Sequence, residues 1–434
     1  MKILNSFLLF LILFSAYTYA DETDSLASNN INEFGISTGT YLTLVFDPGL
    51  TMRSGAENVI TIQNGLARTE DRLIGTRWFS EKGLVGKTGG IVCRYAKYAL
   101  IDLPVDWYSI VFAHEYLGHG ARYRELDIEK IHYAFDMPPP YGGGGGEASA
   151  NIGPGVINDH EVLGIWIGGV EVHSILNKRL SLRWMAKREI QYREASVYFW
   201  AWQIMFSYIQ DTNEDLTTKV NDNDISAYVR IINRHNGYTD YDNLPMDVKD
   251  LKSRTMIDVA NPFLFYTLFT IMKTYFWDGN NSTGLPMPNI KGVGYIPSLR
   301  TGLTPFGLEY HLENYLRFEN KVSLIDLRIG DQTFHNSWGG VGLLIQNMYE
   351  NERFSLDMNL DVWSQPEIEI GGDPVTSKGG GFGGAFSLRG YYDFAGSQYP
   401  ISAMVELGYK SPGFLEGYVL DASPIIMVGI GLRN

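Results

Sequence analysis

Residues 354–362 read Phe-Ser-Leu-Asp-Met-Asn-Leu-Asp-Val, so apolar side chains alternate with polar ones. Residues 399–410 repeat this two-residue period. Successive side chains of a β-strand point to opposite faces, so the alternation predicts strands with one apolar and one polar face. The same signal, between short polar or Gly-rich connections, predicts about eight antiparallel strands. They lie near 293–302, 307–318, 321–330, 337–349, 353–364, 380–394, 399–410 and 423–433.

These strands are expected to close into a barrel, because closure leaves no unpaired edge strand. Their lengths approach the ~9–11 residues that cross a membrane, and the 27 Tyr, 22 Phe, 9 Trp and 47 Gly suit a membrane interface and tight turns. Residues 290–434 resemble the bacterial outer-membrane barrel proteins, which implies apolar side chains outward and polar ones inward. Those proteins usually end on an aromatic residue, whereas residues 431–434 read Gly-Leu-Arg-Asn. The alternative is a soluble sandwich or lipocalin-like barrel with an apolar core face.

The first residues have the order of a secretory signal peptide. Lys2 supplies positive charge, residues 7–14 are an unbroken apolar run, and Ala16 and Ala20 precede the polar residues 21–24. This order predicts a cleaved signal at 1–20 and export to the bacterial outer membrane or periplasm, with an uncleaved anchor as the alternative. Cys93 is the single cysteine, which excludes an intrachain disulfide, and the net charge of −14 argues against nucleic acid as a partner.

The middle of the chain has the spacing of helices. Apolar side chains recur at three- and four-residue intervals over 107–126, 157–211, 223–236 and 246–277, whereas 53–105 has no clear period. Residues 138–146 contain three Pro and five Gly, which predicts a loop or hinge. The run 263–272 is apolar all round but too short to cross a bilayer alone. We interpret it as a buried helix, with a membrane-surface helix as the alternative.

The first of these helices carries the sequence His114-Glu115-Tyr116-Leu117-Gly118-His119. In the zinc-peptidase motif His-Glu-x-x-His, two histidines four residues apart bind the metal and the Glu acts on its bound water. His114 and His119 are five residues apart, about 140° around an ideal α-helix. They can share one metal only where the helix is widened, as by a π-bulge. The alternatives are a structural histidine pair and an inactive site.

This spacing is similar to the HExxGH motif of the dipeptidyl-peptidase III family of zinc exopeptidases. The resemblance covers six residues and implies zinc as cofactor, with His114 and His119 as ligands and Glu115 as catalytic base. In that family, a Glu on a later helix is the third ligand. The family's EExxAE-type motif is missing here, and the family is not a barrel protein, so the resemblance concerns the site alone.

Glu171 is the predicted third ligand, because it lies about fifty residues downstream in a mostly apolar helical segment, 164–176. Gly168 and Gly169 would let that helix approach the histidine helix closely. The alternative is a Glu on a helix surface. The other candidates are Glu161, Glu147 and Glu194, with His173 or His160 as nitrogen ligands.

The sequence therefore predicts an α+β protein. Its expected parts are a signal peptide (1–20), a mixed region with a strand at 34–46 (21–105), a helical zincin-like metal-binding domain (106–285) and an antiparallel barrel (290–434). The expected function is that of an outer-membrane-associated zinc hydrolase, a peptidase acting on peptides or proteins. Two alternatives stay open: a non-enzymatic barrel with a structural or degenerate metal site, and a soluble exported metalloenzyme.

Overall fold

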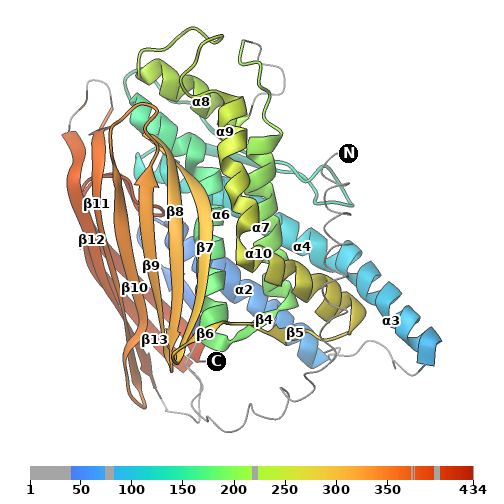
Figure 1. The fold of residues 1–434 in the computed structure, drawn as a ribbon. Helices are drawn as coiled ribbons and strands as arrows, with labels where there is room; N and C mark the ends of the chain where they lie inside the picture. Colours follow the sequence, from blue (N-terminus) through green and yellow to red (C-terminus); the bar gives the residue numbers. More distant parts are fainter. Residues whose placement is uncertain are drawn as a thin grey trace. The chain divides into compact units, whose positions relative to one another are not determined.

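The computed structural model describes residues 41–73, 83–217, 223–372, 375, 377–394 and 401–433. The predicted signal peptide, and residues 34–40 of the first predicted strand, lie outside these ranges. Residues 39–434 belong to one compact unit. In that unit, helices fill the concave side of one large curved sheet, so the architecture is α+β (Figure 1).

The large sheet is antiparallel throughout, and its ten strands follow the order β1-β14-β13-β12-β11-β10-β9-β8-β7-β6. All eight predicted strands are present. β11 ends later than predicted, at Ile370, and β12 begins earlier than predicted, at Ser377. The strands are β1 (Tyr41–Phe46), β6 (Asn289–Ile290), β7 (Val293–Thr304), β8 (Gly307–Phe318), β9 (Lys321–Gly330), β10 (Gly339–Glu350), β11 (Phe354–Ile370), β12 (Ser377–Asp393), β13 (Ile401–Lys410) and β14 (Ser423–Arg433).

Among the described residues, no sheet closes into a barrel, because β1 and β6 end the strand order without pairing to each other. Helix side chains bind the backbone at the two edges instead. Asn58 accepts a hydrogen bond from Val45 N (2.7 Å) and donates one to Val45 O (2.9 Å). At the other edge, Asp258 accepts from Thr301 N at 2.6 Å. These contacts pair part of the edge backbone with the helix layer, in place of the partner strand that the predicted barrel would supply.

The predicted helices are confirmed, and 53–105 adds two that the sequence did not indicate. The described helices are α2 (Met52–Leu73), α3 (Gly83–Lys97), α4 (Leu103–Phe112), α5 (Gly120–Glu125), α6 (Asp159–Lys187), α7 (Tyr192–Gln210), α8 (Asp224–His235), α9 (Val248–Thr255) and α10 (Pro262–Phe269). Three π-helical segments, η2 (Tyr98–Asp102), η3 (Ala113–His119) and η5 (Thr270–Trp277), and the 3₁₀ segment η4 (Met256–Ala260) continue them. The shorter strands are β2 (Ile131–Phe135), β3 (Gly146–Ala150), β4 (Glu189–Gln191) and β5 (Ser282–Gly284).

Helix α6 is the axis of the fold. A capping box starts it, in which Asn158 Oδ1 accepts from Glu161 N and Glu161 Oε2 accepts from Asn158 N. Its 29 residues span about 44 Å and are buried on nearly every side. Two apolar clusters pack α6 against the sheet, one near each end of the strands. Between these clusters, the strands present buried charged side chains to the helix layer, for example Asp326 to Lys178 at 3.2 Å.

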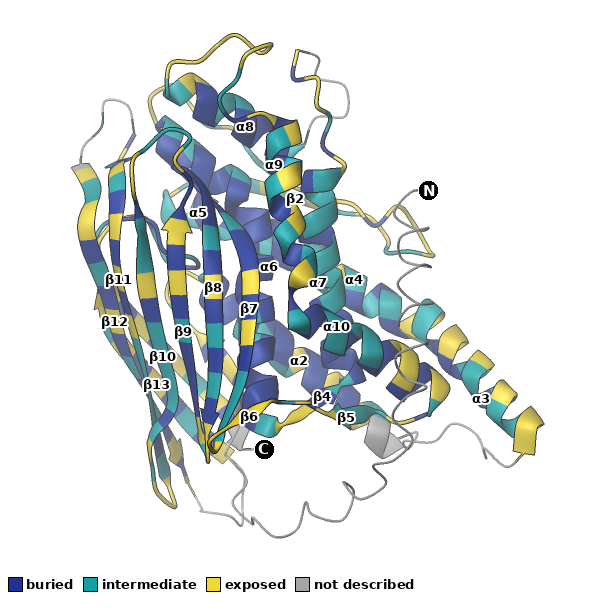
Figure 2. Ribbon diagram, in the orientation of Figure 1, coloured by how far each residue is buried: buried dark blue, intermediate teal, exposed yellow. Residues whose placement is uncertain are grey.

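The two faces of the sheet differ in polarity, and the apolar face is the exposed one (Figure 2). On β13, Val405 and Leu407 are exposed whereas Glu406 between them is buried. On β9, Leu327 is exposed and Asp326 is buried. A soluble β-sandwich has the opposite arrangement, because its buried face forms an apolar core.

The described helices include none that is long and apolar enough to span a membrane by itself. One pair, Val248–Ala260 with Pro262–Trp277, has the required length and composition together and is bent by 60°.

Candidate metal centre

The histidine motif forms the π-helical segment η3. In a π-helix the backbone bonds run from i to i+5, so residues five apart lie on one face. His114 and His119 accordingly turn the same way, and their Nε2 atoms are 3.2 Å apart. The predicted widening of the helix is therefore confirmed, and it converts a five-residue spacing into a shared site.

Helix α6 crosses η3 in direct backbone contact. A Cβ atom on Gly118 would lie 2.6 Å from Gly168 O, and one on Gly169 would lie 2.3 Å from His114 Nε2. Both distances are below any real Cβ contact, so these positions exclude a side chain. The close approach predicted for Gly168 and Gly169 is confirmed.

Asp224, the first residue of α8, is the third member of the group. Its Oδ2 atom lies 3.3 Å from His114 Nε2 and 3.1 Å from His119 Nε2. With the 3.2 Å between the two nitrogens, these atoms form a nearly equilateral triangle. Tetrahedral zinc with bonds of ~2.0–2.1 Å separates its ligands by about 3.3–3.4 Å. The three atoms thus fit three corners of such a tetrahedron and leave a fourth position for water or substrate.

Glu171 has a different partner from the one predicted. Both of its carboxylate oxygens accept hydrogen bonds from Arg122, at 2.6 and 2.8 Å from Nη2, and Gly417 N donates to it at 2.7 Å. A buried Glu needs a positive partner, and the Arg122 guanidinium provides one here. The group that could hold a metal ion contains Asp224, and Glu171 lies outside it.

The other candidate ligands also lie outside the triangle. Glu161 caps α6 and accepts from Gly371 N, and Glu194 accepts from Arg183 and Trp184. Glu147 is an exposed residue of β3. His160 packs against His235, with ring centroids 4.3 Å apart.

His173 is close to the group but acts on a ligand instead of being one. Its Nε2 lies 3.2 Å from His114 Nδ1. On the other ligand, His119 Nδ1 donates to Ile165 O at 2.6 Å. A carbonyl oxygen can only accept, so the Ile165 contact holds the His119 proton on Nδ1 and leaves the Nε2 lone pair for a metal. The His173 contact orients the His114 ring. The Tyr208 ring, 5.2 Å from that of His114, packs against the same ligand.

The candidate ligands shift one another's pKa values. Burial by itself would lower the pKa of His119, but the Asp224 carboxylate raises it to about 9. Burial would likewise raise the pKa of Asp224, but His119 and His114 hold it well below its ordinary value. The carboxylate is therefore ionised and attracts positive charge. A metal ion binding here displaces the proton of His119.

Glu115 lies between the ligands and a short hairpin. Burial raises the pKa of its carboxyl, and the two histidines oppose that effect. A Cβ on Gly146, the first residue of β3, would meet Glu115 Cγ at 2.7 Å. The residues 138–146 predicted as a loop connect β2 to this strand. They bring the edge of a two-stranded sheet directly over the candidate base.

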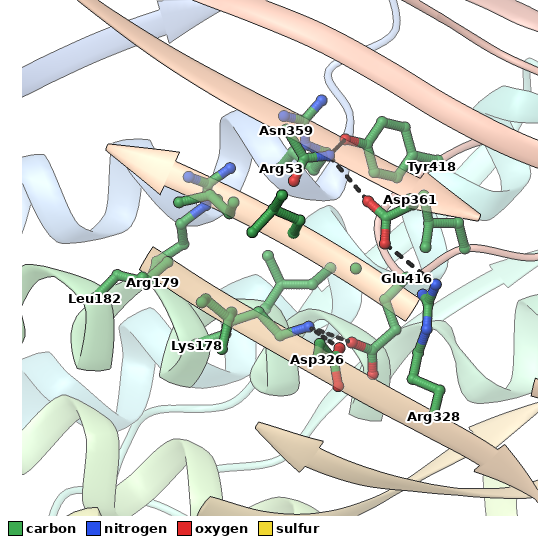
Figure 3. Close-up of a pocket in the computed structure, with 16 residues that line it drawn as sticks. Arg53, Lys178, Arg179, Leu182, Asp326, Arg328, Asn359, Asp361, Glu416 and Tyr418 are labelled. Carbon is green, nitrogen blue, oxygen red and sulfur yellow. Dashed lines mark hydrogen bonds and ion pairs between the residues drawn. The ribbon is translucent and has the colours of Figure 1, made fainter. Parts of the chain in front are cut away.

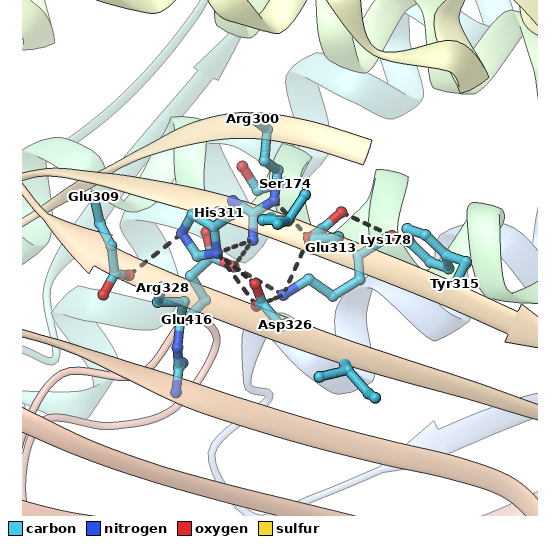
Figure 4. Close-up of polar contacts among 12 residues, drawn as sticks. Ser174, Lys178, Arg300, Glu309, His311, Glu313, Tyr315, Asp326, Arg328 and Glu416 are labelled. Atoms are coloured by element: carbon cyan, nitrogen blue, oxygen red, sulfur yellow. Dashed lines mark hydrogen bonds and ion pairs between the residues drawn. The ribbon is translucent and has the colours of Figure 1, made fainter. Parts of the chain in front are cut away.

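Within the described ranges, one further group has the composition of a metal site: His311, Glu313 and Asp326 on the concave face of the sheet. Its charges are already paired (Figure 4). Arg300 Nε donates to Glu313 at 2.7 Å and Lys178 Nζ to Asp326 at 3.2 Å. The group is therefore an ion-pair network.

A cavity of about 80 Å³ lies beside this network (Figure 3). The charged side chains that line it are Arg53, Lys178, Arg179, Asp326, Arg328, Asp361 and Glu416. It has room for a few water molecules. It shares no lining residue with the metal group, so it is not the substrate site of that group.

No protein-family model, no curated protein and no solved structure matches the chain. The interpretation of the site therefore rests on its own geometry.

Proposed function

We propose that this protein is a zinc-dependent peptidase. The observation that carries the proposal is the triangle of His114 Nε2, His119 Nε2 and Asp224 Oδ2, with sides of 3.1–3.3 Å, next to Glu115. Two imidazoles, one carboxylate and an open fourth position are the ligand set of catalytic zinc.

Zinc, when bound, supplies Lewis acidity, which lowers the pKa of water and polarises a carbonyl group. Glu115 supplies the proton transfers: it takes a proton from the attacking water and returns it to the leaving amine. The raised pKa of Glu115 suits this exchange, since a base closer to neutrality also releases its proton readily. His173 and Ile165 O hold the ligand rings in the required orientation.

The β2–β3 hairpin supports a peptide as the substrate. Among the described strands, β3 pairs with β2 alone. An extended peptide can add to such an edge through its backbone. Since Gly146 contacts Glu115, a peptide on this edge would bring a scissile carbonyl near the base.

We also propose that the sheet meets the outer-membrane bilayer, in line with the predicted export. Its exposed apolar face and buried charged face match the pattern of membrane barrels. The strands of 10–17 residues from β7 to β14 are long enough to cross. In this proposal, the helices that bind the two edges of the sheet take the place of barrel closure.

The test compares His114→Ala, Glu115→Gln and the wild type, with Glu189→Gln, at an exposed position of β4 outside the site, as the matched control. We expect His114→Ala to lose zinc, and Glu115→Gln to retain zinc and lose peptide hydrolysis by roughly 10²–10⁴-fold. Glu189→Gln keeps both properties. Metal content and cleavage of a mixed peptide library are the two measurements.

Full zinc content in His114→Ala would refute the site. Stoichiometric zinc without cleavage of any peptide by the wild type would favour the alternative function, a structural metal site in a non-enzymatic membrane protein.

A further inference from the structure

One helical run of the helix layer buries its charged side chains and exposes its apolar ones. From Ile91 to Phe112, elements α3, η2 and α4 form one continuous helical run. Its four charged residues, Arg94, Lys97, Asp102 and Asp106, are 0–6% exposed. The large side chains that it exposes are Val92, Tyr95, Leu100, Ile101 and Tyr108, at 45–62%. A helix on the surface of a soluble protein has the reverse pattern.

Three of these buried charged residues, Arg94, Lys97 and Asp102, have partners in the helical layer. Lys97 Nζ and Arg193 Nη2 donate to Asp102 at 2.8 and 2.9 Å. Arg94 Nη2 donates to Phe276 O at 2.9 Å. Charged residues inside a membrane protein are held in this way, facing the interior and paired with other groups of the protein.

The segment formed by α10 and η5 shares part of this pattern. Thr267, Thr270 and Thr274 are buried, whereas Met272 and Trp277 are exposed. Its one charged residue, Lys273, is also exposed and pairs with Asp278 at 2.6 Å. The segment belongs to the bent pair that has the length and composition of a membrane span. Tyr95 of α3 packs against Phe276 of η5, with ring centroids 5.6 Å apart, so the two segments are neighbours.

The two flanks of the helical layer continue onto the sheet. Asn58 of α2 binds the β1 edge, and Asp258, just before α10, binds the β7 edge. On α2, Ile62 and Leu66 are exposed while Gln63 and Asn64 are buried. An open sheet edge cannot face hydrocarbon, because its backbone groups would lose their hydrogen bonds. The helices at both edges satisfy part of this backbone and lie between the edges and the bilayer in the proposed arrangement.

We propose that residues 91–112 and 262–277 contact the hydrocarbon of a lipid bilayer and, with the outer face of the sheet, complete one apolar wall around the protein. Residues 91–112 span about 33 Å, close to the ~30 Å hydrocarbon thickness of a bilayer. The inference deepens the membrane location proposed above and does not depend on the metal chemistry. It also places η3, which follows Phe112 directly, at the end of a lipid-facing helix.

The experiment is nitroxide scanning of the full chain in phosphatidylethanolamine–phosphatidylglycerol vesicles. Cys93 is the single cysteine, so Cys93→Ser provides a clean background. Labels are placed singly at Leu100 and Met272 on the helices, at Leu407 on the sheet, and at Tyr238 as an exposed control beyond α8. Collision rates with oxygen and with a water-soluble nickel complex report lipid and water.

We expect Leu100, Met272 and Leu407 to favour oxygen by at least fivefold relative to Tyr238. Nickel accessibility at Leu100 and Met272 equal to that at Tyr238, with Leu407 in lipid, would overturn the helical wall and leave the sheet in the membrane. Water exposure at all four positions would overturn both proposals. Spin–spin broadening at Leu100 with low accessibility to both reagents would show that a second copy covers this face, which also overturns the inference.

Discussion

The sharpest test of the candidate metal site concerns its third ligand. The geometry favours Asp224, whereas the sequence favoured Glu171. Asp224→Asn keeps the size of the side chain and removes its charge. Zinc held by four ligands in small peptides has an apparent binding free energy of about 10–16 kcal/mol, or about 2.5–4 kcal/mol for each ligand. At ~1.4 kcal/mol for each factor of ten, the loss of one ligand weakens zinc binding roughly 10²- to 10³-fold.

Glu171→Gln is the matched control, because it makes the same chemical change at the position that the sequence favoured. It leaves Arg122 buried beside an uncharged amide, with Glu125 as its remaining anion at 2.8 Å. Breaking a buried ion pair costs about 3–5 kcal/mol, and Glu125 reduces that cost here. We therefore expect a lower melting temperature for Glu171→Gln, and zinc affinity within about threefold of the wild type because the triangle is intact.

The assay is competition for zinc against a chromophoric chelator in detergent, with thermal unfolding recorded on the same samples. The two variants should separate: Asp224→Asn loses affinity and retains its fold, whereas Glu171→Gln loses stability and retains affinity. Wild-type affinity in Asp224→Asn would refute the triangle. A loss of zinc in Glu171→Gln equal to that in Asp224→Asn would return Glu171 to the ligand set.

Three further predictions concern the same centre. His173→Ala should weaken zinc binding by about 10–100-fold, because it frees the His114 ring, and an unchanged chelator titration would exclude this positioning role. Gly169→Ala should abolish zinc binding, since its Cβ would lie 2.3 Å from His114 Nε2, whereas Gly164→Ala on the same helix meets its nearest atom at 3.6 Å and should bind normally. Zinc affinity should rise about tenfold for each pH unit up to about 9 and level off above it, because below that pKa a proton on His119 must first leave; titrations from pH 6 to 10 with no slope would contradict this.

The strands could be predicted because alternation records directly which side chains share a face. Alternation could not show whether the sheet closes into a barrel, since closure depends on which elements contact the two edge strands. Asn58 and Asp258 bind the backbone at the two edges from helical segments that lie outside residues 290–434. No periodicity within 290–434 carries that information. Helix α3 was missed because it buries Arg94 and Lys97 and exposes Val92 and Tyr95, the reverse of the pattern that indicates a soluble amphipathic helix.

Asp224 was missed for a related reason. It follows a polar run, 221–223, that reads as a loop, and a sequence does not show which loop end meets a distant helix. Glu171 was chosen because it lies in a buried segment, where a carboxylate requires a cation. Arg122 is three residues after His119, one helical turn away, and this neighbour was the available sign that Glu171 already had a partner.

The inward residues of the long run from α3 to α5 connect the proposed lipid-facing helix to the candidate metal site. Arg94, Lys97, Asp102, Asp106, Ile110, His114, His119 and Arg122 are all buried. Their spacings are three or four residues except for two steps of five, from Lys97 to Asp102 and from His114 to His119.

Each five-residue step falls within a π-helical segment, η2 for the first and η3 for the second. In an α-helix, a five-residue step would turn the later residue about 140° away from the inward face. The π segment restores the register, because its backbone bonds join residues five apart. The widening at η3 therefore meets two needs at once: it brings two histidines onto one metal position, and it keeps Arg122 turned inward toward Glu171. The same device at η2 holds Asp102 against Lys97 and Arg193, which is the arrangement that the proposed lipid contact of this helix requires.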